Sequence, residues 1–574
     1  MNPETFFENF DILCEAPNSI QKLRELILQL AVQGKLVPHD PNDEPASVLI
    51  EKIKAEKKRI SKKSKTKESK SINGINSSQF LYEIPPNWEW TILSECGLIN
   101  PRNDVPDEKE VSFVPMTYIS EKYGQNVETE NRIWKEVKKG FTHFAENDVV
   151  LAKITPCFQN GKSAVMTGLN NGFGAGTTEL HVFRPLNELI NSKYVLIYLK
   201  SPDFIYNGIS KMTGSAGQKR VPKDYFSENP FPLPPLAEQK RIVEKVNELM
   251  ALCDKLEARR QKKQELQSKL NSAALDRMLS AENQEEFEEN WQNICENFDL
   301  LYDNPENVEK LKQAVLQLAV QGKLVPQNPE DEPANVLLEK IKIEKKKIAK
   351  KSKTQGSKSR TNTNSEQVPY EIPSNWKWTA LSECGLINPR NYLPDEKEVS
   401  FVPMTFISEK YGQNVETETR RWREIKKGFT HFAENDVVLA KITPCFQNGK
   451  STVMRGLQNG FGAGTTELHV FRPLIEYISP DYVLIYLKSP SFIDDGIPKM
   501  TGSAGQKRVP KDYFSESPFP LPPLDEQKRI VEKVEQFMDL CDELDSKLRK
   551  TREESEKLME SVVWGLLKEP TAEI

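Results

Sequence analysis

An internal repeat constrains the fold of this chain more than any other feature. Residues 8–253 align with residues 296–541 without a gap, at a constant offset of 288, and two such periods account for nearly all of the 574 residues. Between residues 82 and 246, only 24 of 165 positions differ from the second copy. Two copies this similar must adopt one fold, so the chain should contain two equivalent structural blocks.

Each block ends in a proline-rich segment and a long helical pattern, FPLPPLAEQKRIVEKV at 231–246 and FPLPPLDEQKRIVEKV at 519–534. Proline cannot continue a helix backwards, and apolar residues then recur at steps of four and three, as in a coiled-coil seam. We expect residues 235–279 and 523–567 to pack antiparallel as one coiled coil. The predicted seam residues are Ile242, Val246, Leu249, Cys253 and Leu256 in the first copy, and Ile530, Val534, Phe537, Cys541, Leu544, Leu548, Leu558 and Val562 in the second.

Each block opens with a predicted pair of helices. The motif LQLAVQGKLVP, at 28–38 and 316–326, ends the first helix at its glycine and proline. The second helix follows Pro45 or Pro333 and runs into a lysine-rich tract, EKKRISKKSKTKESK or EKKKIAKKSKTQGSK. Two interpretations of these tracts stay open: a solvated helix end that leads into a linker, or a contact with the DNA backbone.

A head lies between the helices of each block, beginning at an Ile-Pro pair that is followed by Trp-x-Trp. In the first head the pattern predicts strands at 112–119, 148–154, 163–166 and 179–183 and a buried helix at 194–200. The predicted fold class is α/β (α+β), with two tandem heads, each mainly β with helices, joined by the coiled coil. The expected organisation is a helical segment with a Lys-rich linker at 1–78, a head at 79–233, a coiled-coil helix at 234–290, a second helical segment and linker at 291–366, a second head at 367–521 and a C-terminal coiled-coil helix at 522–574.

Composition argues against several classes of protein. The net charge of -5 does not indicate a nucleic-acid binder, so any basic surface must be local. No apolar run reaches the roughly 18 residues that a membrane span needs, and the N-terminus does not resemble a secretion signal, so we expect a cytoplasmic protein. The eight cysteines include no CxxC pair, which argues against a structural zinc site and a disulfide framework.

Several catalytic motifs nearly occur and then fail. Asn160-Gly161-Lys162-Ser163 resembles the end of a phosphate-binding loop, but Pro156 takes the place of the leading glycine. The glycines at 172–176 do not match the dinucleotide-binding spacing, and we expect a flexible loop there. The segment Asn229-Pro-Phe-Pro scrambles a methyltransferase motif, and the histidines lack metal-ligand spacing. We therefore predict no catalytic residue, no metal and no cofactor in this chain.

Three polar loops remain as candidate binding elements: loop 1 (153–162), loop 2 (176–178) and loop 3 (213–220), with their counterparts 288 residues later. Amide side chains can pair with adenine, Arg and Lys with guanine, and Lys, Ser and Thr with phosphates. Ordinary surface loops are the alternative. The candidate DNA-binding residues are Lys153, Thr155, Gln159, Asn160, Lys162, Thr177, Thr178, Ser215, Gln218, Lys219 and Arg220, and their counterparts Lys441, Thr443, Gln447, Asn448, Lys450, Thr465, Thr466, Ser503, Gln506, Lys507 and Arg508.

The arrangement of two heads, each followed by PLPPLAEQKRIVEKV or its variant, resembles the specificity subunit of type I restriction–modification enzymes. LQLAVQGKLVP beside PNDEPAS resembles the branch of that family with long helical N-terminal segments, and DVVLAKITPCFQNGK resembles a motif of its target recognition domains. The match spans essentially the whole chain. Family members usually carry two dissimilar heads, and here the chain departs from the pattern.

The resemblance implies a non-catalytic DNA reader whose target recognition domains each bind half of a bipartite site in the major groove. The paired helices would set the spacing and dock two modification subunits, which methylate adenine with S-adenosylmethionine. Two restriction subunits would add ATP- and Mg-dependent translocation and cleavage. The alternatives are a self-contained methyltransferase or nuclease, and a coiled-coil adaptor that does not bind DNA.

The three loops are identical in the two heads, so we expect both heads to select one base sequence, inverted across a fixed gap. The differences gather at 131–137, 187–193 and 203–210 and their counterparts. In the first of these, Arg421 stands where the first copy has Ile133. This extra arginine could read one additional base and make the halves unequal.

Overall fold

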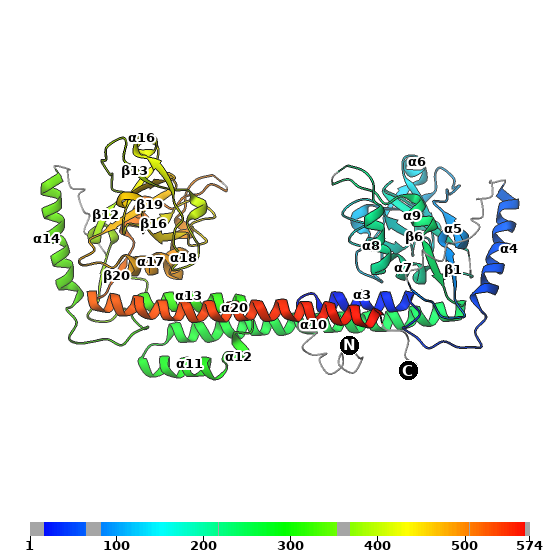
Figure 1. The fold of residues 1–574 in the computed structure, drawn as a ribbon, viewed down its shortest axis with the longest axis horizontal. Helices are drawn as coiled ribbons and strands as arrows, with labels where there is room; N and C mark the ends of the chain where they lie inside the picture. Colours follow the sequence, from blue (N-terminus) through cyan, green and yellow to red (C-terminus); the bar gives the residue numbers. More distant parts are fainter. Residues whose placement is uncertain are drawn as a thin grey trace. The chain divides into compact units, whose positions relative to one another are not determined.

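The computed structural model describes residues 16–64, 82–186, 188–215, 217–352, 368–503 and 505–568. It divides into two compact units, and the boundaries cut through both long helices. The described part of unit 1 comprises 16–263 and 552–568, and unit 2 runs from Gln264 to Thr551 with its gaps. Each unit contains one head and a bundle of helices (Figure 1). The lysine-rich tracts beyond residues 64 and 352, and Asn187, lie outside the described residues.

The head of unit 1 is built on two four-stranded sheets. The first is wholly antiparallel and has the order β2 (Gly97–Ile99), β9 (Leu180–Pro185), β6 (Val149–Ala152), β7 (Ser163–Val165). The second has the order β4 (Glu130–Ile133), β3 (Glu110–Val114), β8 (Phe173–Gly176), β5 (Thr142–Ala145), with β3 and β8 parallel. A separate antiparallel pair joins β1 (Glu89–Ile92) to β10 (Pro230–Leu233).

Strand alternation explains how these sheets stack. Val150 and Ala152 of β6 lie in the core between the two sheets, whereas Val149 and Leu151 face the core on the helical side. That side is covered by α7 (Ser192–Lys200). The remaining helices of the head are α5 (Leu93–Cys96), α6 (Trp134–Val137), α8 (Pro202–Lys211), α9 (Lys223–Glu228), and the 3-10 turns η2 (Met116–Tyr118) and η3 (Asn170–Gly172).

The head of unit 2 repeats this topology at the 288-residue offset. Its sheets have the orders β12-β19-β16-β17 and β14-β13-β18-β15, and β11 pairs with β20. The strands are β11 (Lys377–Thr379), β12 (Gly385–Ile387), β13 (Glu398–Val402), β14 (Glu418–Arg421), β15 (Thr430–Ala433), β16 (Val437–Ala440), β17 (Ser451–Val453), β18 (Phe461–Gly464), β19 (Leu468–Pro473) and β20 (Phe519–Leu521). The helices are α15 (Leu381–Cys384), α16 (Trp422–Ile425), α17 (Pro480–Lys488), α18 (Pro490–Gly496) and α19 (Lys511–Glu516), with the 3-10 turns η4 (Met404–Phe406), η5 (Gln458–Gly460) and η6 (Ile497–Lys499).

Most predicted elements occur where the sequence pattern placed them. The long helices α10 (Leu236–Ser280) and α20 (Leu524–Lys568) begin directly after the prolines. The predicted strand at 112–119 is too long, because β3 ends before Pro115 and a 3-10 turn follows.

The opening helices are α3 (Ser19–Val32) and α4 (Ala46–Ser64) in the first block, and α13 (Pro305–Gln321) and α14 (Ala334–Ser352) in the second. Two further helices are α11 (Gln284–Glu296) and α12 (Phe298–Leu301).

The helical bundle of each unit, called the stalk below, contains parts of both long helices. In unit 1, Ile20 and Leu23 of α3 pack with Cys253 of α10 and with Met559 and Val562 of α20. In unit 2, a cluster joins the other end of α10 to α13 and α20; it includes Leu275, Met278, Val308, Leu311, Leu318 and Cys541. Later residues of α10 thus meet earlier residues of α20, so the two helices run antiparallel, as predicted.

Part of the predicted seam has another partner. Ile242 and Val246 pack in the core of their own head rather than against α20, and Ile530 and Val534 do the same in unit 2. Leu558 is 38% exposed and does not belong to the seam. The reason is that α3 and α13 pack against a head with one part of their surface and against the long helices with another. Each long helix therefore begins by covering a head and meets its partner helix only later. Among the described residues, no helix is both long and apolar enough to cross a membrane.

Candidate nucleic-acid interface

Backbone hydrogen bonds bring the three predicted loops of head 1 together. Lys153 of loop 1 donates its N–H to the carbonyl of Glu179, just after loop 2, at 2.9 Å. The carbonyl of Lys153 accepts from Val221, just after loop 3, at 2.8 Å. Thr155 N–H donates to the carbonyl of Lys219 at 2.9 Å. Loop 1 therefore lies between loops 2 and 3, and the three form one surface.

An ion pair fastens loop 3 to the end of loop 2. Arg220 Nε and Nη2 donate to the two carboxylate oxygens of Glu179 at 2.9 and 2.8 Å, and Nη1 donates to the carbonyl of Gln218 at 3.1 Å. These hydrogen bonds lower the pKa of the Glu179 carboxyl. Arg508 binds Glu467 in the same way in head 2. Because the pair occupies the guanidinium fork, Arg220 orients the loops in addition to any base contact it makes.

Two threonine hydroxyls also hold the loops in place. Thr155 Oγ1 donates to the carbonyl of Gly217 at 3.0 Å and accepts from Lys219 N–H at 3.1 Å. Thr177 Oγ1 accepts from Glu179 N–H at 3.2 Å. The exposed side chains on the surface that these bonds create include Thr178, Ser215, Gln218 and Lys219. This group has the chemistry that base and phosphate contacts need.

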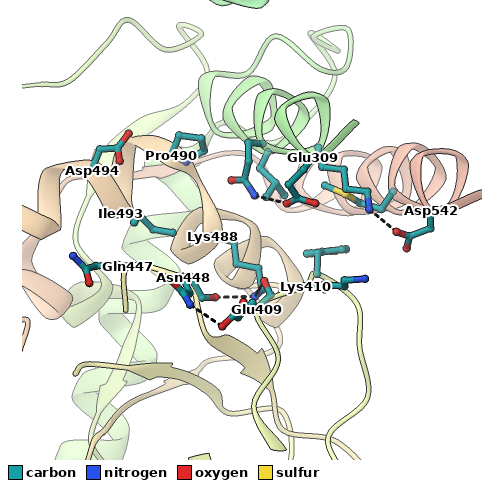
Figure 2. Close-up of a pocket in the computed structure, with 16 residues that line it drawn as sticks. Glu309, Glu409, Lys410, Gln447, Asn448, Lys488, Pro490, Ile493, Asp494 and Asp542 are labelled. Carbon is teal, nitrogen blue, oxygen red and sulfur yellow. Dashed lines mark hydrogen bonds and ion pairs between the residues drawn. The ribbon is translucent and has the colours of Figure 1, made fainter. Parts of the chain in front are cut away.

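The tip of loop 1 lies elsewhere. Asn160 Nδ2 donates to Glu121 Oε1 at 2.9 Å, and Asn448 binds Glu409 at the same distance. In unit 2, Gln447 and Asn448 line a cavity of about 370 Å³ whose other wall includes Glu309, Lys312 and Asp542 of the stalk (Figure 2). The predicted residues thus divide into a group beside loops 2 and 3 and a group that faces the stalk in unit 2.

The glycines after residue 172 do not form the flexible loop that we expected. Residues 173–176 form β8, a buried central strand, and only Gly176 continues into loop 2. A Cβ on Gly174 would lie 2.3 Å from the Phe144 ring, and one on Gly176 would lie 2.7 Å from the carbonyl oxygen of Val114. Glycine is needed here for close packing between strands rather than for mobility.

The structure also identifies residues that sequence reasoning missed. Glu179 and Glu121 are acidic, so a search for DNA-binding side chains passes over them, and Lys200 lies within an apolar helical pattern. Their partners are 39 to 41 residues away in sequence, and no local spacing indicates such contacts. The repeat offers one signal, because all three residues recur in the second copy as Glu467, Glu409 and Lys488.

A buried histidine supports the surface from below. His181 of β9 donates from Nε2 to the carbonyl of Val221 at 3.1 Å and stacks on Phe226 with ring centroids 5.1 Å apart. Burial lowers the pKa of His181 from its ordinary 6.5 to about 4, and His469 is affected equally. Both imidazoles are therefore neutral at pH 7.

These histidines predict acid sensitivity. Between pH 6.5 and 4 the unfolded chain binds a proton that the folded head does not, so the free energy of unfolding falls as pH drops through this window. The expected loss is about 3 kcal/mol per head by pH 4. His181→Gln with His469→Gln, which cannot titrate, should flatten the acid limb of a plot of unfolding free energy against pH. An acid limb as steep as in the parent chain would contradict this assignment.

The described residues of the heads were compared with the requirements of a metal site and of a methyltransferase motif. No group of three or more His, Cys, Asp or Glu side chains is arranged to hold a metal ion there. Asn229, in the segment that resembled a methyltransferase motif, donates Nδ2 to the hydroxyl of Tyr198 at 2.7 Å and serves in packing.

Comparison with known proteins connects this surface to a family. Residues 50–268 and 373–552 match the profile of the type I restriction modification DNA specificity domain. The type I restriction enzyme EcoAI specificity subunit of Escherichia coli is 40% identical over 536 residues, covering 92% of this chain and 90% of that protein. The EcoEI specificity subunit of Escherichia coli is 36% identical over 544 residues, covering 93% and 91%.

A solved structure supports the fold alone. It comes from work on complex assembly and conformational transition of the type I R-M system, aligns with a TM-score of 0.51 at 18% identity, and covers 85% of this chain and 99% of its own. The family profile and the two Escherichia coli relatives carry the assignment, because the profile matches both copies of the repeat and each relative covers more than 90% of this chain. The chain therefore belongs to the DNA specificity subunits of type I restriction–modification enzymes, as their DNA-recognition component rather than a catalytic one.

Proposed function

We propose that the chain binds a bipartite DNA site, that each head reads one half-site through loops 1, 2 and 3, and that the half-sites form an interrupted palindrome. The observation that carries the proposal is the identity of these loops in the two heads, together with the hydrogen bonds that gather them onto one surface in each head. Exposed amides would pair with base edges, and lysines would hold the phosphates.

The stalk would act as the ruler between half-sites. Each long helix begins on one head, and its last turns pack in the bundle of the other unit. The length of α10 and α20 would then set the distance between the half-sites. At ~1.5 Å per residue, some 45 residues make a rod of roughly 65 Å, enough for half-sites about one DNA turn apart.

The chemistry would come from other subunits. Two modification subunits, carrying S-adenosylmethionine, would methylate adenines that the heads select, and two restriction subunits, with ATP and Mg, would translocate and cleave unmodified DNA. The specificity subunit would work with them in the cytoplasm. The resemblance to specificity subunits and the absence of an intact catalytic motif in the sequence support this division of labour.

Substitution of the exposed amides tests which residues read bases. Gln218→Ala should reduce discrimination at one half-site by on the order of 1–3 kcal/mol if its amide pairs with a base edge. Gln159→Ala and Asn160→Ala should do the same if the tip of loop 1 reads bases, and should leave discrimination intact if the tip serves the junction with the stalk. Gel shifts of the complex with its modification subunit, on duplexes with intact and altered half-sites, measure these differences.

Lys162→Ala is the matched control for a phosphate contact. Loss of one contact with a DNA phosphate should weaken binding to all sequences alike, without changing discrimination between them. The slope of the logarithm of affinity against the logarithm of salt concentration should become shallower by about one. Full discrimination in Gln218→Ala, Gln159→Ala and Asn160→Ala together would show that the heads read DNA with another surface.

A further inference from the structure

A buried lysine lies beneath the tip of loop 1 in each head. Lys200, the last residue of α7, is only 7% exposed, and its Nζ donates to the carbonyls of Gly161 at 2.8 Å, Glu121 at 2.9 Å and Ser120 at 3.2 Å. An ammonium group has three N–H donors, and these carbonyls use all three. The lysine thereby joins the tip of loop 1 to the turn at 120–121.

The same arrangement occurs in head 2. Lys488 is 3% exposed and donates to the carbonyls of Gly449 at 2.8 Å, Glu409 at 2.9 Å and Ser408 at 3.4 Å. Figure 2 shows Lys488 pointing toward the loop segments that carry Glu409 and Asn448. The two heads differ at 24 of 165 aligned positions, and none of the residues in this contact is among them.

Retaining a cation at this position is unfavourable for the fold. Burial lowers the pKa of both lysines to about 7, which measures the cost of keeping the charge inside the protein. In the described part of the chain, no carboxylate hydrogen-bonds to Lys200 Nζ: the carboxylate of Glu121 accepts from Asn160 instead. A methionine would fill the same space without this cost, so the hydrogen bonds to the loops are the evident reason for a lysine.

Loop 1, which Lys200 holds, is in turn connected to loop 3. The backbone of loop 1 pairs with that of loop 3 through Thr155 and Lys219 at 2.9 Å, and the Phe158 side chain of loop 1 is fully buried under α8. A shift of Gly161 would therefore be transmitted along a short, well-packed loop to the exposed side chains of loop 3.

We propose that Lys200 and Lys488 are positioning residues for base recognition: each holds loop 1 in the conformation that presents loops 1 and 3 to the DNA. The inference rests on the proposed function of these loops. The lysines themselves are buried and do not touch DNA, so their removal should alter specificity without removing a phosphate contact.

Lys200→Met tests the inference in the full-length chain with its modification subunit, after the methylated sequence has been read. Binding is measured on duplexes with two, one or no intact half-sites. The parent complex should lose affinity at both steps of this series. In the variant, discrimination by head 1 should fall roughly tenfold. The duplexes with two and with one intact half-site should then bind with affinities within about twofold of each other. The duplex with one intact half-site should still bind more tightly than the duplex with none, because head 2 is unchanged.

Two further variants separate a positioning role of Lys200 from a folding defect and from the simple loss of a positive charge. Lys200→Gln keeps two N–H donors and should retain part of the discrimination, which a defect in folding would not explain. Lys193→Met removes an exposed positive charge from the same helix and should behave like the parent.

Three outcomes would overturn the inference. The first is full discrimination in Lys200→Met when Gln218→Ala loses it. The second is an equal loss of binding to all three duplexes, which would indicate unfolding of the head. The third is Lys200→Gln behaving as Lys200→Met. If Lys200→Met and Gln218→Ala both keep full discrimination, the proposed reading surface itself is wrong.

Discussion

Deleting seven residues from each long helix is expected to shorten the unspecified spacer of the methylated site and to abolish methylation at the original spacing. Seven residues contribute about 10 Å of helix, equal to no more than about three base pairs at 3.4 Å each. A deletion of one heptad keeps the apolar seam in phase, so the antiparallel contacts can re-form. Suitable segments are 259–265 of α10 and 550–556 of α20, which lie between the two apolar clusters of the stalks.

The control keeps the length and changes the residues. Replacing the same two segments by other polar heptads should leave the spacer as it is, because only the rise of the helices enters the ruler. A third variant, with the deletion in α10 alone, puts the two helices out of step and should lose stability rather than acquire a new spacing. An unchanged spacer in the methylome of the paired deletion would refute the ruler role.

The second prediction with a large expected effect is that the two half-sites of the target are inverted copies of one sequence. Type I specificity subunits with unlike heads would read unlike half-sites, but here the three loops carry the same side chains in both heads. The bonds that gather the loops recur in head 2: Lys441 N–H donates to the Glu467 carbonyl at 2.9 Å, and Thr443 N–H donates to the Lys507 carbonyl at 2.9 Å. Identical surfaces on antiparallel helices should select inverted copies of one sequence.

The structure places the substitution that most threatened this symmetry away from the loops. Ile133 pairs with Glu110 at the start of β3, whereas loop 2 leaves the sheet at the other end, where Val114 lies beside Gly176. From Glu110 to Val114 is four residue steps, which is roughly 13 Å of strand. Arg421, the counterpart of Ile133, pairs with Glu396 at 3.3 Å.

A different substitution lies closer to the reading surface. α8 packs directly on loop 1, and its Tyr206, 77% exposed, is replaced in α18 by Asp494. Asp494 lines the cavity in unit 2 together with Gln447 of loop 1. If one half-site contains an additional specified base, exchanging Tyr206 and Asp494 between the heads should move that base to the other half-site. That result would show that this pair, rather than Arg421, accounts for the additional base.

The fold was predictable wherever a local pattern carried the information. The prolines and the step of four and three residues located α10 and α20 to within a residue, and Pro115 shows how a single breaker shortened a predicted strand. The division of each long helix between head and partner helix was not predictable. Ile242 and Cys253 occupy the same helical stripe, and only the position of α3 decides that one packs in the head and the other in the stalk.

The candidate site was predictable in part for the same reason. Glycines, amides and cations marked the three loops, and the repeat showed that both heads keep them. What joined the loops was not visible, because Arg220 and Glu179 are 41 residues apart and Lys200 reads as one more position of a buried helix. The glycines of β8 were misinterpreted because the sequence alone does not distinguish a glycine required for close packing from a glycine required for mobility.

Single-molecule sequencing of methylated adenines, in a host that expresses this chain with its modification subunits, tests the central claim most directly. The loops are identical, so we expect one half-site followed by its reverse complement across a fixed gap, with a methylated adenine in each half. Two unrelated half-sites would contradict the claim that the duplicated heads read DNA through these loops.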